Sequence, residues 1–247
     1  LFCGVVCRLL LELSYRFACR EMDAEDDDFD DRFCPVLYEG LNPEKMKVKP
    51  AVSKIGFRIF VYGDLIWRHN FPFHSTVKGY IKGQERLFIQ GSMDCYGTKE
   101  QPGRVATLYP EDEGIVWGIT YLVNEEDVDE TKFRMDVEPK PGHCLMKAMF
   151  YPADKSEPYE VFTPLSVPSE NPCYYGKESF EETVEAILRS SGMCGSNVDY
   201  IFRLAQHLRE IGSEAMDPKL AKLEESVVKL CLERGIHMKS IKNFGYG

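Results

Sequence analysis

Short apolar runs separated by Gly and Pro fill the middle of the chain. They are rich in β-branched and aromatic residues, which favour β-strands. The runs are "IGFRIFVYG", "VKGYIKGQERLFIQG", "GRVATLY", "GIVWGITYLV", "HCLMKAMFYP" and "PYEVFTPL". Within "FRIFVYGDLIW" a turn at Gly63 separates two apolar segments, which predicts a strand-to-strand corner. One helical stretch, residues 126–137, interrupts the strands and should end before Pro139. The pattern predicts a sheet or small barrel.

Polar residues mark three helix starts in the last third of the chain. The expected starts are Ser179 with Glu182, Ser196 with Asp199, and Asp217 with Pro218. Apolar residues follow each start at helical spacing, and Gly212 and Gly235 are expected to end the second and third helices. We therefore expect three helices whose apolar sides pack on the sheet.

The first part of the chain has a different composition. The segment "EMDAEDDDFDD" holds eight acidic residues in eleven, which repel one another and bury nothing. The opening twenty residues mix apolar residues with Arg, as expected of a transit-like segment, a fragment or an alternative start. We expect residues 1–52 to be a disordered or targeting-like arm, residues 53–235 to be the folded domain and residues 236–247 to be a tail.

Net charge and residue usage narrow the classes of function. The formal charge is −10, so we expect no nucleic-acid partner. No apolar run approaches the ~20 residues of a membrane span, and we expect a soluble, cytoplasmic monomer without a membrane partner. The nine cysteines lack C-x-x-C spacing and the five histidines are scattered, so we expect free thiols, no metal and no cofactor.

Two weaker signals for chemistry remain open. Cys95 is a candidate nucleophile if one of His69, His74 or His143 lies beside it in space, as in cysteine hydrolases. Glycines at expected strand corners either shape hairpins or let backbone N–H groups approach an anionic ligand. These glycines are Gly63, Gly79, Gly91, Gly97 and Gly103.

Seven segments, taken together, carry a family resemblance. They are "FVYGDLIW", "FPF", "VKGYIKG", "FIQGSMDCYGTKEQPGRVATL", "VWGITYLV", "NPCYYG" and "GSNVDYIFRL". In this order and spacing, over about residues 56–212, they resemble the ChaC-like family of glutathione-specific γ-glutamylcyclotransferases. The resemblance implies an α+β fold, a γ-glutamylcyclotransferase-like small mixed β-barrel with flanking helices. It also implies a substrate, glutathione or another γ-glutamyl peptide, whose α-amino group attacks its own γ-carbonyl without a cofactor.

The same resemblance assigns roles to particular residues. The turn formed by Tyr62, Gly63, Asp64 and Leu65 would frame the γ-glutamyl end and present backbone N–H donors to the developing oxyanion. Glu138 would carry the proton from the attacking ammonium to the leaving amine, as a carboxylate with a raised pKa can. Tyr174 would donate a hydrogen bond to the substrate.

Three positions depart from the family pattern. Val61 and Asp64 stand where the family has Gly and Ser, and an anionic Asp64 would either repel substrate carboxylates or pair with the α-ammonium. Pro139 stands at the position of the family's glutamate, so that Glu138 lies one residue early and Asp136 is the other nearby carboxylate. Two hypotheses follow. We favour an active enzyme with Glu138 as the base over a non-catalytic relative that binds a γ-glutamyl compound or a protein.

Overall fold

The computed structural model describes residues 55–134, 142–168, 171–176 and 178–236. The predicted arm over residues 1–52, nearly all of the predicted tail, and the carboxylates Asp136 and Glu138 lie outside these residues.

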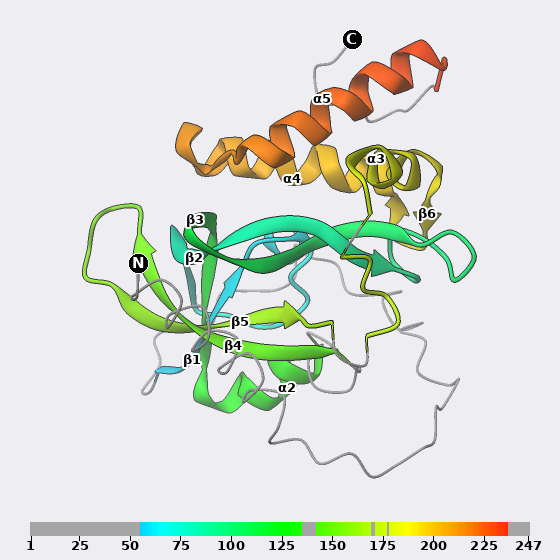
Figure 1. Cartoon of the computed structure of the whole chain (residues 1–247). Coiled ribbons are helices and arrows are strands. Elements are labelled where there is room, and N and C mark those ends of the chain that lie inside the picture. Colours follow the sequence, from blue (N-terminus) through cyan, green and yellow to red (C-terminus); the bar gives the residue numbers. More distant parts are fainter. Residues whose placement is uncertain (1–54, 135–141, 169–170, 177, 237–247) are drawn as a thin grey trace, which may run out of the picture.

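Five strands form a closed barrel (Figure 1). They are β1 (Ile55–Val61), β2 (Ser75–Ser92), β3 (Gly103–Asn124), β4 (His143–Pro152) and β5 (Tyr159–Ser166). Their order in the barrel is β1-β3-β2-β4-β5, and β1 closes it by pairing with β5 in parallel. All the other strand pairs of the barrel are antiparallel, which confirms the predicted small mixed barrel.

Two details of the predicted strands are wrong. "GRVATLY" and "GIVWGITYLV" belong to one strand, β3, because β2 continues alongside and a register shift between Lys82 and Gln84 accommodates the polar residues between them. The segment after Gly63 is a 3-10 turn, η3 (Asp64–Ile66), and not a strand. Its backbone bonds locally instead of joining the barrel, since Ile66 N donates to Gly63 O at 3.1 Å.

Two of the five glycines at expected corners lie elsewhere. Gly79 and Gly91 lie inside β2, and none of the five has a positive φ. A Cβ atom on Gly79 would lie 2.3 Å from the backbone oxygen of Tyr151. That glycine is therefore required by the close approach of β4 and not by a turn.

The remaining helical elements are η4 (Glu125–Asp127), α2 (Val128–Arg134), α3 (Phe180–Arg189), α4 (Asn197–Ile211), η5 (Ser213–Ala215) and α5 (Pro218–Glu233). The three helices α3, α4 and α5 begin where the sequence predicted, whereas η5 was not predicted. Ser179 and Glu182 form the predicted reciprocal capping box, and Ser196 and Asp217 each accept a backbone N–H as N-caps. Gly235, with φ +62°, ends α5 as expected.

The helices α3, α4 and α5 cover one side of the barrel, with α4 between the barrel and α5 (Figure 1). Alternate residues of β1 face two different cores. Ile59 and Val61 pack against the helix layer, whereas Phe60 and Tyr62 lie in the interior of the barrel. This period of two places the end of β1, where the η3 turn begins, between both cores.

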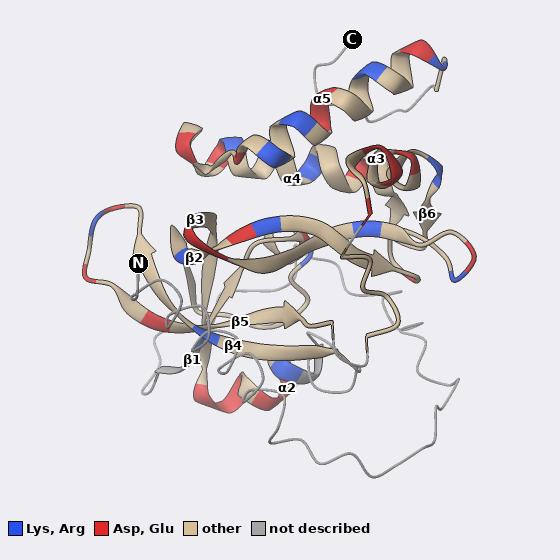
Figure 2. Ribbon diagram, in the orientation of Figure 1, with Lys and Arg blue, Asp and Glu red and all other residues tan. Residues whose placement is uncertain are grey.

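Charged residues of both signs occur along α4 and α5, while the η4–α2 segment is mainly acidic (Figure 2). No helix in the described part of the chain combines the length and apolar character needed to cross a membrane.

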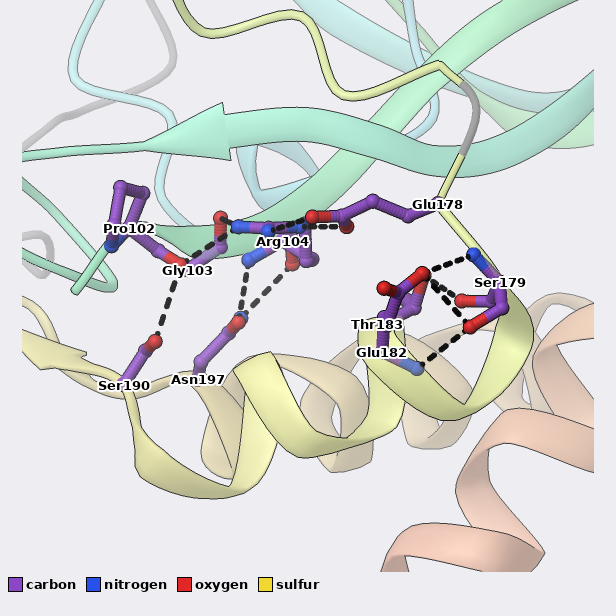
Figure 3. A network of polar contacts seen from close by, with 9 residues as sticks. All are labelled: Pro102, Gly103, Arg104, Glu178, Ser179, Glu182, Thr183, Ser190 and Asn197. Carbon is purple, nitrogen blue, oxygen red and sulfur yellow. Dashed lines mark hydrogen bonds and ion pairs between the residues drawn. The ribbon is translucent and has the colours of Figure 1, made fainter.

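A buried polar link fastens the helix layer to the barrel (Figure 3). Asn197, the first residue of α4, accepts from Arg104 N at 2.5 Å and donates to Arg104 O at 2.9 Å. The Arg104 guanidinium forms an ion pair with Glu178 and lies 3.9 Å from the centre of the Tyr175 ring. Arg104, Tyr175 and Asn197 all come from segments that carried the family resemblance, and the structure gives them this architectural role.

Replacement of Asn197 by Ala should destabilise the fold. The change leaves the buried N–H and C=O of Arg104 without partners, which we expect to cost about 3 kcal/mol of unfolding free energy. Urea unfolding would measure this cost, provided that the dependence of the unfolding free energy on urea concentration is the same for the variant and the parent protein. Gln206→Ala is the matched control, because Gln206 is exposed on the same helix and bonds only to Glu210. Equal unfolding midpoints for the two variants would contradict the prediction.

Candidate functional site

The η3 turn is held from the barrel side by Arg86 of β2. This side chain is buried, with 2% of its surface exposed. Its Nε atom donates to Tyr62 O at 3.2 Å and Nη2 donates to Trp117 O at 2.6 Å, while Nη1 pairs with Asp217. In a trans peptide the N–H points away from the C=O, so Arg86 directs the N–H of Gly63 to the opposite side of the turn.

Aromatic residues hold the other end of the turn. The hydroxyl of Tyr121 lies 3.2 Å from Leu65 O, 3.1 Å from Ile66 O and 3.1 Å from His69 Nδ1. The His69 ring in turn packs edge-on against Phe71 and Phe73, and its partial burial lowers its pKa. The "FPF" segment and Tyr121 of "VWGITYLV" therefore both help to hold the turn in place.

The turn presents free backbone donors. Among the described residues, no oxygen atom accepts a hydrogen bond from the N–H of Gly63 or of Leu65. Both residues are partly exposed. Two N–H groups so placed can bind the oxygen of a polarised carbonyl, which is the role that the resemblance implied for this turn.

Asp64 has a cationic partner that the sequence argument missed. Arg68 Nη1 lies 3.4 Å from Asp64 Oδ2 and 3.4 Å from the Tyr96 hydroxyl, and it also contacts Cys95 Sγ. Desolvation raises the pKa of Asp64, and the charge of Arg68 and a hydrogen bond from Tyr96 oppose this rise. Because 32% of the Asp64 side chain remains exposed, solvent also moderates the shift. The i, i+4 spacing of an acid and an arginine was the available signal.

Tyr62 has its side chain in the barrel and its backbone in the turn. Its hydroxyl donates to Pro164 O at 2.8 Å, and the ring belongs to the interior core. Tyr200 of α4 lies on the other side of the turn, its hydroxyl 3.5 Å from the place of a Cβ atom on Gly63. The same hydroxyl accepts from Ala106 N at 2.8 Å. Tyrosines whose hydroxyl groups bond to the backbone thus lie on both sides of the turn.

A disulfide borders the turn, so the expectation of free thiols is wrong for two cysteines. Cys95, in the loop after β2, is bonded to Cys194, which lies between the short strands β6 (Ser191–Gly192) and β7 (Gly195–Ser196). The two residues are 99 positions apart and meet because Cys194 N donates to Cys95 O at 2.8 Å. Sulfur in a disulfide is not a nucleophile, so the geometry gives the cysteine-hydrolase hypothesis no support.

Comparisons with known proteins identify the family of the chain. A family model described as ChaC-like protein matches residues 57–230. The chain belongs to the ChaC-like family. Its relatives include glutathione-specific γ-glutamylcyclotransferase 1 of Homo sapiens, 33% identical over 68% of this chain and 77% of the relative. The protein of the same name from Danio rerio is 34% identical over 74% of this chain and 95% of the relative.

A solved structure supports the fold of this ChaC-like chain. The crystal structure of a γ-glutamyl cyclotransferase specific to glutathione from yeast superimposes with a TM-score of 0.64 at 24% identity. The match covers 71% of this chain and 97% of the yeast chain. At this identity the similarity concerns the architecture, which is the mixed barrel with flanking helices.

Of the remaining predicted site residues of the ChaC-like chain, Tyr174 lies in the segment beside β2 and Glu138 lies outside the described residues. Tyr174 forms an isolated bridge with Gln90 on β2, and its side chain is partly exposed near Tyr109, where burial raises its pKa. Within the described ranges, no backbone hydrogen bond joins Tyr174 to residues 62–65. The roles of Tyr174 and Glu138 stay predictions. In the same ranges, no three His, Cys, Asp or Glu side chains gather as metal ligands.

The raised pKa of Asp64 predicts a particular pH dependence of stability. The folded protein binds this proton more tightly than the unfolded chain, so Asp64 lowers stability as the pH rises from about 4 through the folded-state pKa. Asp64→Asn removes that loss. We therefore expect the stability of the variant relative to the parent protein to increase between pH 4 and pH 7 in urea unfolding.

Glu182→Gln is a control in which the expected change of stability with pH has the opposite sign. The Ser179 backbone N–H lowers the pKa of Glu182, so this carboxylate adds stability above about pH 4.5 and loses it in acid. The Gln variant should therefore become less stable than the parent as the pH rises. If Asp64→Asn followed the same trend, the proposed destabilisation by burial of Asp64 would be wrong.

Proposed function

We propose that this chain is a glutathione-specific γ-glutamylcyclotransferase, a lyase that converts glutathione to 5-oxoproline and Cys-Gly. The observation that carries the proposal is the ChaC-like match over residues 57–230, which spans the η3 turn, the barrel and most of the helix layer. Relatives that are named for this activity align with about seven-tenths of the chain, which supports the same conclusion.

The reaction needs the substrate to be folded onto itself. The α-amino nitrogen attacks the γ-carbonyl carbon and closes a five-membered ring, and the bond from that carbon to the cysteine nitrogen then breaks. Nucleophile and electrophile belong to one molecule, so the main task of the protein is to hold their geometry. In this mechanism the N–H groups of Gly63 and Leu65 stabilise the negative charge that develops on the carbonyl oxygen.

The Asp64–Arg68 pair fits the charged end of a γ-glutamyl group. That end carries an α-ammonium and an α-carboxylate, and the two side chains offer the opposite charges 3.4 Å apart. Arg68 therefore offsets the repulsion that Asp64 alone would exert on substrate carboxylates. The pairing removes one ground for the binding-only hypothesis, which rested on Asp64 and Pro139.

Glu138 completes the mechanism as proton carrier, and Tyr174 as hydrogen-bond donor to the substrate. A carboxylate that accepts the proton of the α-ammonium can return it to the leaving amine, so that one group serves as base and then as acid. We also propose that the protein acts as a cytoplasmic monomer without nucleic-acid or membrane partners, a view supported by its charge of −10 and interspersed surface charges.

Product release from reduced glutathione tests the proposal. The purified chain should yield 5-oxoproline and Cys-Gly in equal amounts. Glu138→Gln keeps the side-chain shape but cannot titrate, so it should lower kcat by about 100-fold or more. Glu160→Gln is the matched control, since Glu160 is exposed on β5 and pairs with Lys147.

The possible results separate the function from the residue. A folded parent protein that releases neither product would refute the cyclotransferase function. A Glu138→Gln variant as active as the parent would leave the function intact and exclude Glu138 as the proton carrier. Asp136→Asn would then test the other nearby carboxylate.

A further inference from the structure

The Cys95–Cys194 disulfide lies beside the η3 turn. Both residues are partly exposed. Cys95 adjoins the Asp64–Arg68 pair through its contact with the Arg68 guanidinium. Disulfides in cytoplasmic proteins are usually transient or redox-sensing, because the cytosolic thiol pool keeps structural ones reduced. We therefore ask whether this disulfide takes part in thiol–disulfide exchange in addition to stabilising the fold.

The two sulfur atoms are not equivalent. The cationic Nη1 of Arg68 bonds to Cys95 Sγ, whereas no hydrogen bond from a cation to Cys194 Sγ is found among the residues that the structure describes. A neighbouring guanidinium stabilises a thiolate and makes that sulfur the better leaving group. An incoming thiolate should therefore attack Cys194 and release Cys95.

The backbone keeps the two segments together when the sulfur bond opens. Cys194 N donates to Cys95 O at 2.8 Å and Met193 N donates to Asp94 O at 3.0 Å. The backbone at Gly192 also packs closely, since a Cβ atom there would lie 2.4 Å from Asp94 O. With the partner segments held in place, the disulfide can open and close again without unfolding.

We propose that the Cys95–Cys194 disulfide is an exchange site for glutathione, with the mixed disulfide formed at Cys194. The glutathione thiolate attacks Cys194 Sγ, a new sulfur–sulfur bond forms, and the electron pair of the broken bond leaves on Cys95 Sγ beside Arg68. A second glutathione thiolate then attacks the glutathionyl sulfur. It releases oxidised glutathione and a Cys194 thiolate, so that the protein gains two electrons and two glutathione molecules lose one each.

Exchange would make the charges around the η3 turn depend on the ratio of reduced to oxidised glutathione. A Cys95 thiolate competes with the Asp64 carboxylate for Arg68, because one guanidinium nitrogen contacts both groups. The inference takes glutathione from the proposed function but does not require turnover. The exchange and the cyclisation can therefore fail independently.

Mass spectrometry of the full-length oxidised chain tests the site of exchange. The protein is incubated with defined ratios of reduced to oxidised glutathione, quenched with acid and mapped by peptide masses. We expect the glutathionyl group on Cys194 to exceed that on Cys95 by at least about threefold. Arg68→Gln should bring this ratio close to one, and Arg68→Lys, which keeps the charge, should retain most of the preference.

Cysteine variants provide the controls. Cys95→Ser should carry more glutathionyl adduct on Cys194 than the parent protein, because the Cys95 thiol cannot displace it and only a second glutathione can. Cys173→Ser should leave the pattern unchanged, since Cys173 is a partly exposed cysteine in the segment beside β2 and does not belong to the Cys95–Cys194 disulfide. Unfolding midpoints of the variants would show that each is folded.

Two results would overturn the proposal. One is a disulfide that stays closed at every glutathione ratio in the folded protein but is reduced after unfolding. The other is an adduct on Cys95 in the parent protein and in Arg68→Gln alike. Repeating the mapping with Glu138→Gln keeps glutathione from being consumed. Exchange without product formation in the parent protein would refute the cyclotransferase function and leave this inference standing.

Discussion

The buried guanidinium of Arg86 is the contact on which the arrangement of the site depends. Its three nitrogen atoms bond to Tyr62 O at the end of β1, Trp117 O on β3 and the Asp217 carboxylate at the start of α5. A buried cation is costly unless its donors are satisfied, so these three elements must converge on Arg86 in the folded state. Asp217 also accepts from Leu220 N at 2.8 Å as the N-cap of α5. One carboxylate thus positions the outer helix and neutralises the cation beneath the turn.

The second constraint comes from the division of β1 between two cores. Its alternate side chains pack into the barrel and against the helix layer, so neither face of the strand can move without disrupting a core. The turn that follows inherits this rigidity, and Tyr121 fixes its far end through the carbonyl oxygens of Leu65 and Ile66. A site whose main task is to fold a substrate onto itself gains from such rigidity, because small displacements weaken orientation effects.

Local signals in the sequence were sufficient for most of the fold. Ser179 with Glu182 and Asp217 with Pro218 predicted helix starts correctly because capping depends only on residues within one turn. The corner at Gly63 was misjudged because strand and 3-10 turn differ there only in which carbonyl oxygens the next few N–H groups reach. The ion pair of Arg86 with Asp217 joins residues 131 positions apart, so no local pattern in the sequence predicts it. The Cys95–Cys194 disulfide joins residues 99 positions apart, and no local pattern in the sequence predicts it either.

The departure at Asp64 has to be considered together with its neighbours. Considered alone in the sequence, an aspartate in a turn of oxyanion donors disfavours an anionic ligand. In the folded chain its charge is offset by Arg68. The backbone N–H of Arg68 donates to Asp64 O at 2.7 Å, and its guanidinium contacts the Tyr96 hydroxyl and the sulfur of Cys95. Asp64, Arg68 and the disulfide therefore interact electrostatically as one group. When the disulfide opens, the negative charge of the Cys95 thiolate weakens the interaction of the Arg68 guanidinium with the Asp64 carboxylate. The substitution alters the turn from a neutral donor site to one whose balance of charge depends on the thiol chemistry beside it.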